Sequence, residues 1–217
     1  MKKIFLVFVS ALMLITLFSC AQQVKKMPQE IKPEADLSKL SQATFASGCF
    51  WCMEGVYESV KGVQEVVSGY SGGKEPNPTY EQVGSHATGH AEVVEVYYDP
   101  TVVSYATLLK VYFASQNPTQ VNGQGPDNGE PYRSIIFYRT PDEKMQAENY
   151  KSEIQKQYKE PIAATIEPFE KFWEAEAYHQ DYIKHNPNVP YVRGESIPRI
   201  KRFQNKFPAL IKPDHKL

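Results

Sequence analysis

The stretch of sequence from residue 46 to residue 54 reads Ala46-Ser47-Gly48-Cys49-Phe50-Trp51-Cys52-Met53-Glu54. A β-favouring run at 44–47 leads into it, a glycine permits a tight turn, and helix-compatible residues follow from Phe50. These features predict a strand, a turn and a helix, with Cys49 at the turn. A thiol there lies beside the free N–H groups and the positive dipole end of a helix, which favours the thiolate.

The composition is that of one globular domain. The 217 residues are 41% hydrophobic and 23% charged, a mixture that fits neither a disordered chain nor a coiled coil. A chain of this length can bury a sizeable core. The net charge of -1 at pH 7 gives no electrostatic reason to expect a nucleic-acid partner.

The first 40 residues predict an export signal followed by a tether. Two lysines precede an apolar run at 4–18, which is shorter than the roughly 20 residues of a membrane span and indicates a signal peptide. A small residue stands directly before Cys20, as in bacterial lipoprotein signals that lose residues 1–19 and are lipidated on the cysteine; ordinary secretion is the alternative. Residues 20–40 are then a polar, flexible tether. We therefore expect a lipid-anchored protein on the periplasmic side of the bacterial envelope.

The spacing of Cys49 and Cys52 suits a redox pair, a metal site or two small buried side chains. A static disulfide is open to an exported protein, but a bridge between such close neighbours closes a very small loop and constrains the unfolded chain little. His86 and His90 are four residues apart, yet the glycine-containing loop around them argues against a helical metal pair. The pattern favours a reactive pair without a metal.

The chain from Ser41 onward alternates strand patterns with helix patterns. Strands are expected at 44–47, 63–68, 91–98, 133–139 and 163–166, and helices at 50–60, 104–114, 140–158 and 173–185. Residues 74–89 and 115–131 are expected to be irregular. We expect the tail from Asn186 to wrap the domain surface, with the basic residues of 199–206 in solvent. This order favours a single α+β domain over 41–217, a two-layer α/β sandwich. The plait is expected to be ferredoxin-like, with a mixed, mainly antiparallel sheet.

Glu92 is the most informative carboxylate in the sequence. Alternation along 91–98 places it with Val94 and Val96 on the more apolar face of the strand. Burial there raises the pKa of a carboxyl group and keeps it protonated near neutral pH, as a general acid requires. The alternative is that the strand end projects Glu92 into solvent.

Four further polar residues have a structural interpretation beside a functional one. Asp127 lies in a glycine-rich run that is typical of turns. Tyr80 and Tyr132 are phenols on or beside loops and can donate hydrogen bonds. We expect His179 to cap or pack within its own helix.

Five motifs occur in an order and spacing that point to one family. They are Gly48-Cys49-Phe50-Trp51-Cys52, Gly69-Tyr70-Ser71-Gly72-Gly73, Asn77-Pro78-Thr79-Tyr80, Gly89-His90-Ala91-Glu92 and Tyr132-Arg133-Ser134. Together they resemble the A-type peptide methionine sulfoxide reductases. The resemblance runs from about 44 to 186, includes Tyr178-His179-Gln180, and covers most of the chain that follows the predicted signal.

The resemblance implies a role for each matching residue. Cys49 is implied as the nucleophile and Glu92 as the acid that protonates the sulfoxide oxygen. The residues implied in substrate binding are Tyr80 and Tyr132 at that oxygen, Phe50 and Trp51 around the substrate methyl group, and Asp127 in the pocket. Pro126 and Pro131 depart from the asparagine and glutamine common in the family, so the loop that carries Asp127 and Tyr132 is expected to differ in shape.

The resemblance also implies reduction of the S epimer of free or peptide-bound methionine sulfoxide, which leaves a sulfenic acid on Cys49. Many family members resolve this acid with cysteines near the C-terminus, whereas no cysteine follows Cys52 here. Cys52 is then the candidate for a disulfide that a thioredoxin-like reductant reopens. We expect a monomeric protein-repair enzyme with no bound cofactor. A general thiol–disulfide oxidoreductase and a metal-binding lipoprotein are the alternatives, and the first gives Glu92 no role.

Overall fold

The computed structural model describes residues 37–217. The predicted signal peptide, the lipidation site Cys20 and most of the predicted tether lie outside them. A 3-10 turn, Leu37–Lys39, precedes the first strand, which begins at Ser41. No helix in the described part of the chain is long and apolar enough to cross a membrane.

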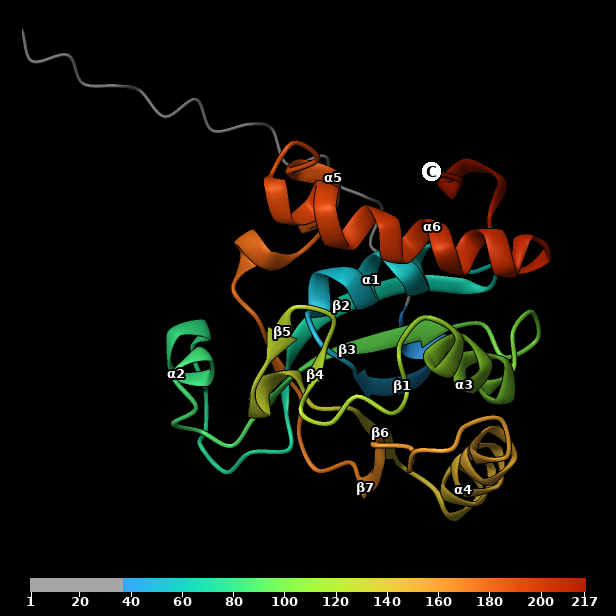
Figure 1. Ribbon diagram of the computed structural model, residues 1–217, viewed down its shortest axis with the longest axis horizontal. Coiled ribbons are helices and arrows are strands. Elements are labelled where there is room, and N and C mark those ends of the chain that lie inside the picture. Colours follow the sequence, from blue (N-terminus) through green and yellow to red (C-terminus); the bar gives the residue numbers. More distant parts are fainter. Residues whose placement is uncertain (1–36) are drawn as a thin grey trace, which may run out of the picture. The chain divides into compact units, whose positions relative to one another are not determined.

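A six-stranded sheet forms the centre of residues 37–217, with the strand order β7-β6-β1-β3-β2-β8 (Figure 1). The strands are β1 Ser41–Ala46, β2 Val63–Ser71, β3 Ala91–Tyr98, β6 Ile135–Tyr138, β7 Thr165–Pro168 and β8 Trp173–Glu174. Neighbouring strands are antiparallel except for the β6–β7 pair, which is parallel. The inner order β6-β1-β3-β2 is that of a ferredoxin-like plait, so the predicted mixed, mainly antiparallel sheet is confirmed.

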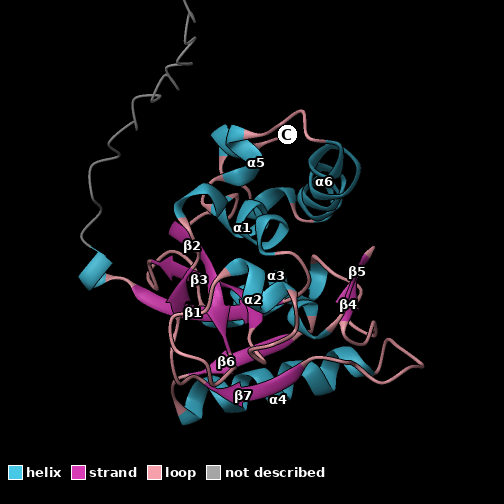
Figure 2. Cartoon of the chain, turned by 90° about the vertical axis from the view of Figure 1, so that its left-hand side faces the viewer, coloured by secondary structure: helices cyan, strands magenta, loops and turns pink. Residues whose placement is uncertain are grey.

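Helices cover one face of the sheet (Figure 2). The helices are α1 Phe50–Glu58, α2 Tyr80–Gly84, α3 Tyr105–Ala114, α4 Pro141–Gln155, α5 Tyr182–His185 and α6 Ile197–Lys206. The main core lies between the sheet and the long helices, and Phe45, Met53 and Leu108 are fully buried in it. A smaller cluster on the opposite face is covered by Phe169 and Phe172 rather than by a helix. The two-layer prediction is therefore confirmed.

Local sequence signals place the starts of α3 and α4. The Ser104 side chain accepts a hydrogen bond from the backbone N–H of Thr107 and caps α3. Thr140 caps α4 in the same way through Glu143 N–H, with Pro141 at the first helical position. Both helix starts were predicted from these residues.

Two segments that were expected to be irregular contain short elements. Helix α2 lies inside 74–89 and begins with a capping box, in which Thr79 and Gln82 exchange side-chain and backbone hydrogen bonds. The run at 115–131 contains a small hairpin of β4 Gly123–Gln124 and β5 Asp127–Asn128, followed by the 3-10 turn Glu130–Tyr132.

The helix predicted at 173–185 is wrong. Trp173 and Glu174 instead pair with β2 at the edge of the sheet, and a 3-10 turn, Ala177–His179, separates them from the short helix α5. Pairing with the open edge of β2 satisfies backbone groups that a helix would otherwise satisfy internally.

The tail is not a simple wrapping segment, because it contains a π-helical turn, Val192–Ser196, that leads into α6. Ile200 and Phe203 are buried on α6, which packs against α1 (Figures 1 and 2). Arg199 is 7% exposed, so the prediction of a solvated basic face is wrong for this residue. Lys201 is exposed as expected. The chain ends in two 3-10 turns, Pro208–Leu210 and Pro213–His215.

Candidate active site

The turn between β1 and α1 places Cys49. Gly48 has a φ of +66°, and a Cβ added there would lie 2.4 Å from Cβ of Gln124, so both the conformation and the space require glycine. The Gly48 N–H donates to the Tyr132 carbonyl oxygen at 3.1 Å. Cys49 is the N-cap residue of α1 and is 6% exposed. The predicted strand, turn and helix are therefore confirmed.

Glu92 projects from β3 toward the start of α1. Its Oε2 accepts a hydrogen bond from the Phe50 N–H at 2.9 Å, and the side chain is buried at 3% exposure. Burial raises the pKa of Glu92 to about 8, although the Phe50 N–H acts in the opposite direction. Of the two alternatives that the sequence left open for Glu92, the structure shows the buried one, and at neutral pH this group carries a proton.

The two cysteines are reduced, buried and different in acidity. Burial raises the pKa of the Cys49 thiol, and Cys52 and Glu92 add to this effect. The hydrogen bond between the thiols lowers the pKa of Cys52, which Arg199 and Ser196 lower further. Burial at Cys49 therefore acts against the thiolate that the helix N-terminus favours. Negative charge on the pair is more stable on Cys52.

Aromatic rings form an apolar wall beside Cys49. Phe50 is fully buried, and its ring centroid lies 6.1 Å from that of Trp51 and 6.3 Å from that of Tyr80. Trp51 is half-buried and stacks on Tyr182 with the ring centroids 3.7 Å apart. Tyr191 meets the same indole edge-on at 6.0 Å. Trp51 is therefore held between tyrosines and presents part of its ring to solvent.

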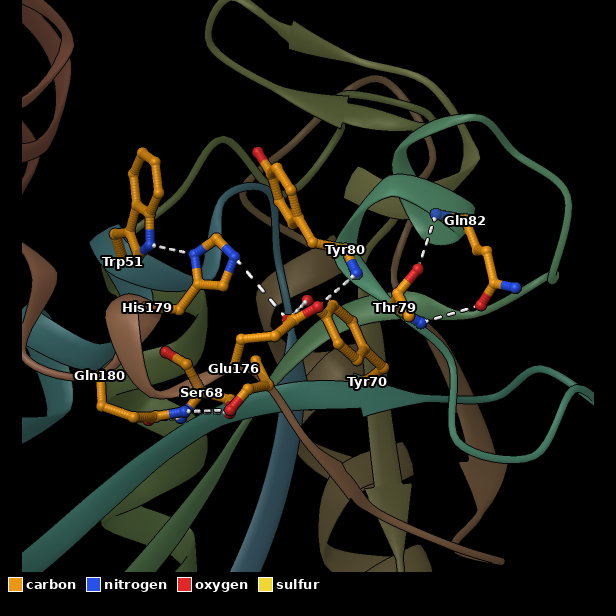
Figure 3. Close-up of polar contacts among 10 residues, drawn as sticks. Trp51, Ser68, Tyr70, Thr79, Tyr80, Gln82, Glu176, His179 and Gln180 are labelled. Carbon is orange, nitrogen blue, oxygen red and sulfur yellow. Dashed lines mark hydrogen bonds and ion pairs between the residues drawn. The ribbon is translucent and has the colours of Figure 1, made fainter.

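A network of hydrogen bonds next to this wall holds the Trp51 indole, the Tyr70 hydroxyl and the backbone of Tyr80 (Figure 3). Trp51 Nε1 donates to Nδ1 of His179 at 3.1 Å, and Nε2 of the same imidazole lies 3.9 Å from Glu176. Glu176 accepts hydrogen bonds from the Tyr70 hydroxyl and from the Tyr80 N–H, both at 2.9 Å. Burial lowers the pKa of His179, which keeps the imidazole neutral with its proton on Nε2. The expectation that His179 serves its own helix is wrong.

Two phenols and one further carboxyl group approach the Cys49–Glu92 pair. Burial raises the pKa of Tyr80 to about 12 and also raises that of Tyr132, and negative charge on Glu92 or Cys49 raises both further. Both phenols therefore stay protonated and can donate hydrogen bonds at neutral pH. Asp127, in β5, accepts a hydrogen bond from the Tyr191 hydroxyl at 2.6 Å, and burial raises the pKa of this carboxyl group.

The structure thus places all eight residues singled out from the sequence, other than Cys20, around the start of α1. Sequence reasoning gave no functional role to several residues that contact them, namely Glu176, His179, Tyr182, Tyr191, Ser196 and Arg199. All six follow the last strand that was predicted. The motif Tyr178-His179-Gln180 was the available signal for the first part of this segment, and no pattern in the sequence marks Ser196 or Arg199.

One group of three potential metal ligands occurs among residues 37–217, formed by Glu54, Glu58 and Asp181 with their ligand atoms within 4.8 Å of one another. It includes neither cysteine. The chemistry available at Cys49 is that of a thiol next to a protonated carboxyl group, two phenols and an apolar wall. Such a set can protonate a weakly basic oxygen while a sulfur nucleophile attacks the atom that carries it.

Comparison with known proteins agrees with this chemistry. Residues 41–210 match the family described as "Peptide methionine sulfoxide reductase". The chain is 45% identical over 170 residues to peptide methionine sulfoxide reductase MsrA 1 of Rhodopirellula baltica, an alignment that covers 78% of this chain and 88% of that protein. Among solved structures, the reduced form of Mxr1 from Saccharomyces cerevisiae is 34% identical with a TM-score of 0.66, covering 70% of this chain and 88% of Mxr1. Methionine sulfoxide reductase A of Corynebacterium diphtheriae is 31% identical with a TM-score of 0.63, covering 72% and 82%. The chain therefore belongs to the A-type peptide methionine sulfoxide reductases, the enzymes that reduce methionine sulfoxide to methionine.

Proposed function

We propose that Cys49 attacks the sulfur of methionine S-sulfoxide, free or within a peptide, while Glu92 gives a proton to the sulfoxide oxygen. The observation that carries this assignment is the buried Glu92 carboxyl group, whose pKa of about 8 keeps it protonated at neutral pH next to the N-cap cysteine. A sulfoxide is a poor electrophile until its oxygen is protonated or strongly hydrogen-bonded. An acid that is already protonated at working pH meets that need.

The other residues of the site are assigned to substrate binding. Tyr80 and Tyr132 donate hydrogen bonds to the sulfoxide oxygen, since both phenols stay protonated. Phe50 and the exposed part of Trp51 form the wall against the substrate methyl group. Asp127 completes the pocket on the side of the β4–β5 hairpin. Because these rings and donors are already in place, less entropy is lost when the sulfoxide is positioned for reaction.

The nucleophile must lose its proton before it attacks, and Cys52 is the candidate base. The two thiols interact, which raises the pKa of Cys49 and lowers that of Cys52. Transfer of the Cys49 proton to Cys52 creates the attacking thiolate inside the site. Attack then forms a Cys49–sulfur bond, the oxygen leaves the substrate sulfur for Cys49, and methionine departs with Cys49 as a sulfenic acid.

Resolution of the sulfenic acid is assigned to Cys52. Its sulfur attacks Sγ of Cys49, the thiol proton and the sulfenic hydroxyl leave as water, and a disulfide forms. No cysteine follows Cys52 in the chain, which supports this assignment. Two electrons must then come from a dithiol, and we propose a thioredoxin-like protein as the donor with no bound cofactor.

The purified protein from residue 21 onward tests the reaction. With dithiothreitol it should reduce a peptide containing methionine S-sulfoxide and leave the R epimer unchanged, and Cys49→Ser should abolish turnover. A folded wild-type sample without turnover would overturn the assignment. Reduction of insulin disulfides without sulfoxide reduction would instead favour a general thiol–disulfide oxidoreductase, a function in which Glu92 has no assigned role. Stoichiometric zinc or copper in the purified protein would favour a metal-binding lipoprotein.

We also propose that the enzyme is a monomeric lipoprotein of the bacterial envelope, which repairs oxidised proteins on the periplasmic side. The apolar run at 4–18 and the small residue before Cys20 support this location. Radiolabelled palmitate should appear on the wild-type protein and not on Cys20→Ser, which should be released from the membrane fraction. Labelling of both proteins, or release of both, would contradict the anchor.

A further inference from the structure

A cavity of about 530 Å³ opens onto the cysteine pair from the side of α6 and the β4–β5 hairpin. Among the residues that the structure describes, its lining includes Cys52 but not Cys49, Phe50 or Glu92. The volume lies within the roughly 300–1,000 Å³ that is usual for sites of small ligands. The cavity therefore reaches the pair at Cys52, and it borders the substrate side of the site at Asp127 and Tyr191.

A buried cation forms part of this cavity. The Arg199 guanidinium donates to the Ser115 carbonyl at 2.7 Å, to the Ser47 carbonyl at 3.1 Å and to Sδ of Met53 at 3.1 Å. All of these acceptors are neutral, and none of the ion pairs within residues 37–217 involves Arg199. In the reduced enzyme a Cys52 thiolate can act as the counter-ion of Arg199, which lowers the pKa of that thiol. In the Cys49–Cys52 disulfide this negative charge is gone, and a buried charge without a counter-ion is unfavourable. An anion that enters the cavity would stabilise Arg199.

The remaining charges of the cavity leave it net positive. Arg202 and Lys206 are exposed cations that line it together with Arg199. The two carboxyl groups in the lining are Asp127 and Glu195, and the first of them is hydrogen-bonded by the Tyr191 hydroxyl. Three cations against two acids favour an anionic visitor over a cationic one.

We propose that this cavity admits the thiolate of the reductant, which attacks Sγ of Cys52 there rather than Sγ of Cys49. The inference rests on the Cys49–Cys52 disulfide of the proposed function. In the first step the reductant sulfur bonds to Cys52, the disulfide breaks, and Cys49 leaves as a thiolate that takes up a proton. A second reductant thiolate then attacks the reductant sulfur of this mixed disulfide. Cys52 leaves as a thiolate, and the reductant is oxidised to its disulfide by two electrons.

The surroundings of Cys52 suit a leaving group for the second step. Sγ of Cys52 is hydrogen-bonded to Oγ of Ser196 at 3.3 Å and lies 3.9 Å from the Tyr191 hydroxyl. Ser196 and Arg199 are three residues apart at the start of α6, so they face α1 together. Both groups lower the pKa of the Cys52 thiol, and a less basic thiolate leaves faster in disulfide exchange.

The attacked sulfur can be identified directly in the purified protein. One equivalent of methionine S-sulfoxide should first remove two hydrogen masses from the enzyme, which reports the disulfide. If that loss is absent, the proposed role of Cys52 fails before the cavity is tested. The oxidised enzyme is then mixed with 2-mercaptoethanesulfonate, quenched in acid, freed of thiol, alkylated and cleaved after Phe50 or Trp51 to separate the two cysteines. We expect the sulfonate adduct on Cys52 and the alkyl group on Cys49, and the reverse pattern would overturn the proposal.

The charge of the cavity supplies an independent test. The ratio of reduction rates by anionic 2-mercaptoethanesulfonate and cationic cysteamine is compared at equal thiolate concentrations. Arg202→Glu should lower this ratio by roughly threefold or more at low salt, since an exposed charge changes such a rate modestly. Lys201→Glu makes the same charge change at an exposed position of α6 that does not line the cavity, and it should leave the ratio near the wild-type value. An unchanged ratio in Arg202→Glu, or equal changes in both variants, would overturn the proposal.

Discussion

Replacement of Glu92 by glutamine separates the acidity of this side chain from its shape. The amide keeps an oxygen that can accept the hydrogen bond from the Phe50 N–H, which is 2.9 Å long in the wild type. It removes the titration and the proton that the proposed reaction transfers. Two consequences follow, one for the pH dependence of stability and one for catalysis.

The effect on stability follows from the pKa of the buried carboxyl group. Folding raises this pKa from 4.5 to about 8, which corresponds to roughly 5 kcal/mol at about 1.4 kcal/mol for each factor of ten. Because the native state binds the proton more tightly, this contribution is complete below pH 4.5 and is lost as the pH rises through 8. Between acidic and alkaline pH, the wild type should therefore lose several kcal/mol more unfolding free energy than Glu92→Gln.

Urea unfolding of both proteins under reducing conditions, at about pH 4.5 and about pH 9, measures this difference. Catalysis is measured on the same samples as methionine formed from the S-sulfoxide. Loss of a general acid should reduce kcat/KM by roughly 10²–10⁴ at neutral pH. The wild-type fall in kcat/KM above pH 8 should be absent from Glu92→Gln. A variant within tenfold of the wild type, or an identical pH dependence of stability in both proteins, would refute the reasoning.

Glu54 offers a matched control for Glu92. It is equally buried at 3% exposure, burial also raises its pKa to about 8, and its carboxyl group accepts hydrogen bonds from Ser68 and from the Asp181 N–H. Glu54→Gln should reduce the pH dependence of stability in the same direction while sulfoxide reduction persists. If Glu54→Gln loses as much activity as Glu92→Gln, the loss reflects disruption of α1 rather than a missing acid.

Three further substitutions test other parts of the site. Cys52→Ser also lacks the proposed base, so it should form one equivalent of methionine per enzyme more slowly than the wild type and then stall with thioredoxin; sustained turnover at the wild-type rate would contradict a disulfide at Cys52. His179→Ala removes the acceptor of the Trp51 indole N–H, which should lower kcat/KM by about tenfold, mostly through KM; unchanged kinetics would argue that stacking alone positions the indole. Gly48→Ala forces a side chain into a positive-φ turn and against Gln124, and it should lower the unfolding free energy by about 2–4 kcal/mol. A loss below about 1 kcal/mol in thermal or urea unfolding would show that the turn relaxes.

The plait was predictable because its signals are local. Alternation in the strand at 91–98 and the caps at Ser104 and Thr140 each depend on neighbours within a few residues, and the structure retains them. The segment at 173–185 failed for the opposite reason. Trp173 pairs with Tyr70, more than a hundred residues earlier, and such pairing leaves no mark in the local pattern. Tertiary contacts there override helix propensity.

In the candidate site, too, the features that depend on local sequence were predictable and those that depend on tertiary contacts were not. Burial of Glu92 was one of two alternatives that the pattern of its own strand left open, whereas the lowered pKa of Cys52 depends in part on Arg199 of α6 and on Ser196 directly before it. Arg199 begins a run with several basic residues at 199–206, and for this reason the sequence analysis assigned it to solvent. Its guanidinium instead satisfies two carbonyl groups at Ser47 and Ser115 that no secondary structure pairs. Only the folded chain shows that this need exists.

The position of the two cysteines on α1 bears on whether they can join without unwinding the helix. Cys49 is the N-cap, with non-helical backbone angles of φ -57° and ψ 127°, and Cys52 is the third residue of the helix. In a capping box, the side chains at these two positions each reach the backbone of the other residue, and the Cys49 thiol lies close enough to lower the pKa of Cys52. Oxidation therefore requires rotation of two side chains, while the Cys52 N–H can keep its 3.2 Å hydrogen bond to the Cys49 carbonyl. The proposed role of Cys52 would need no cysteine from the tail, where α6 and the turn before it instead place Arg199 and Ser196 beside Cys52.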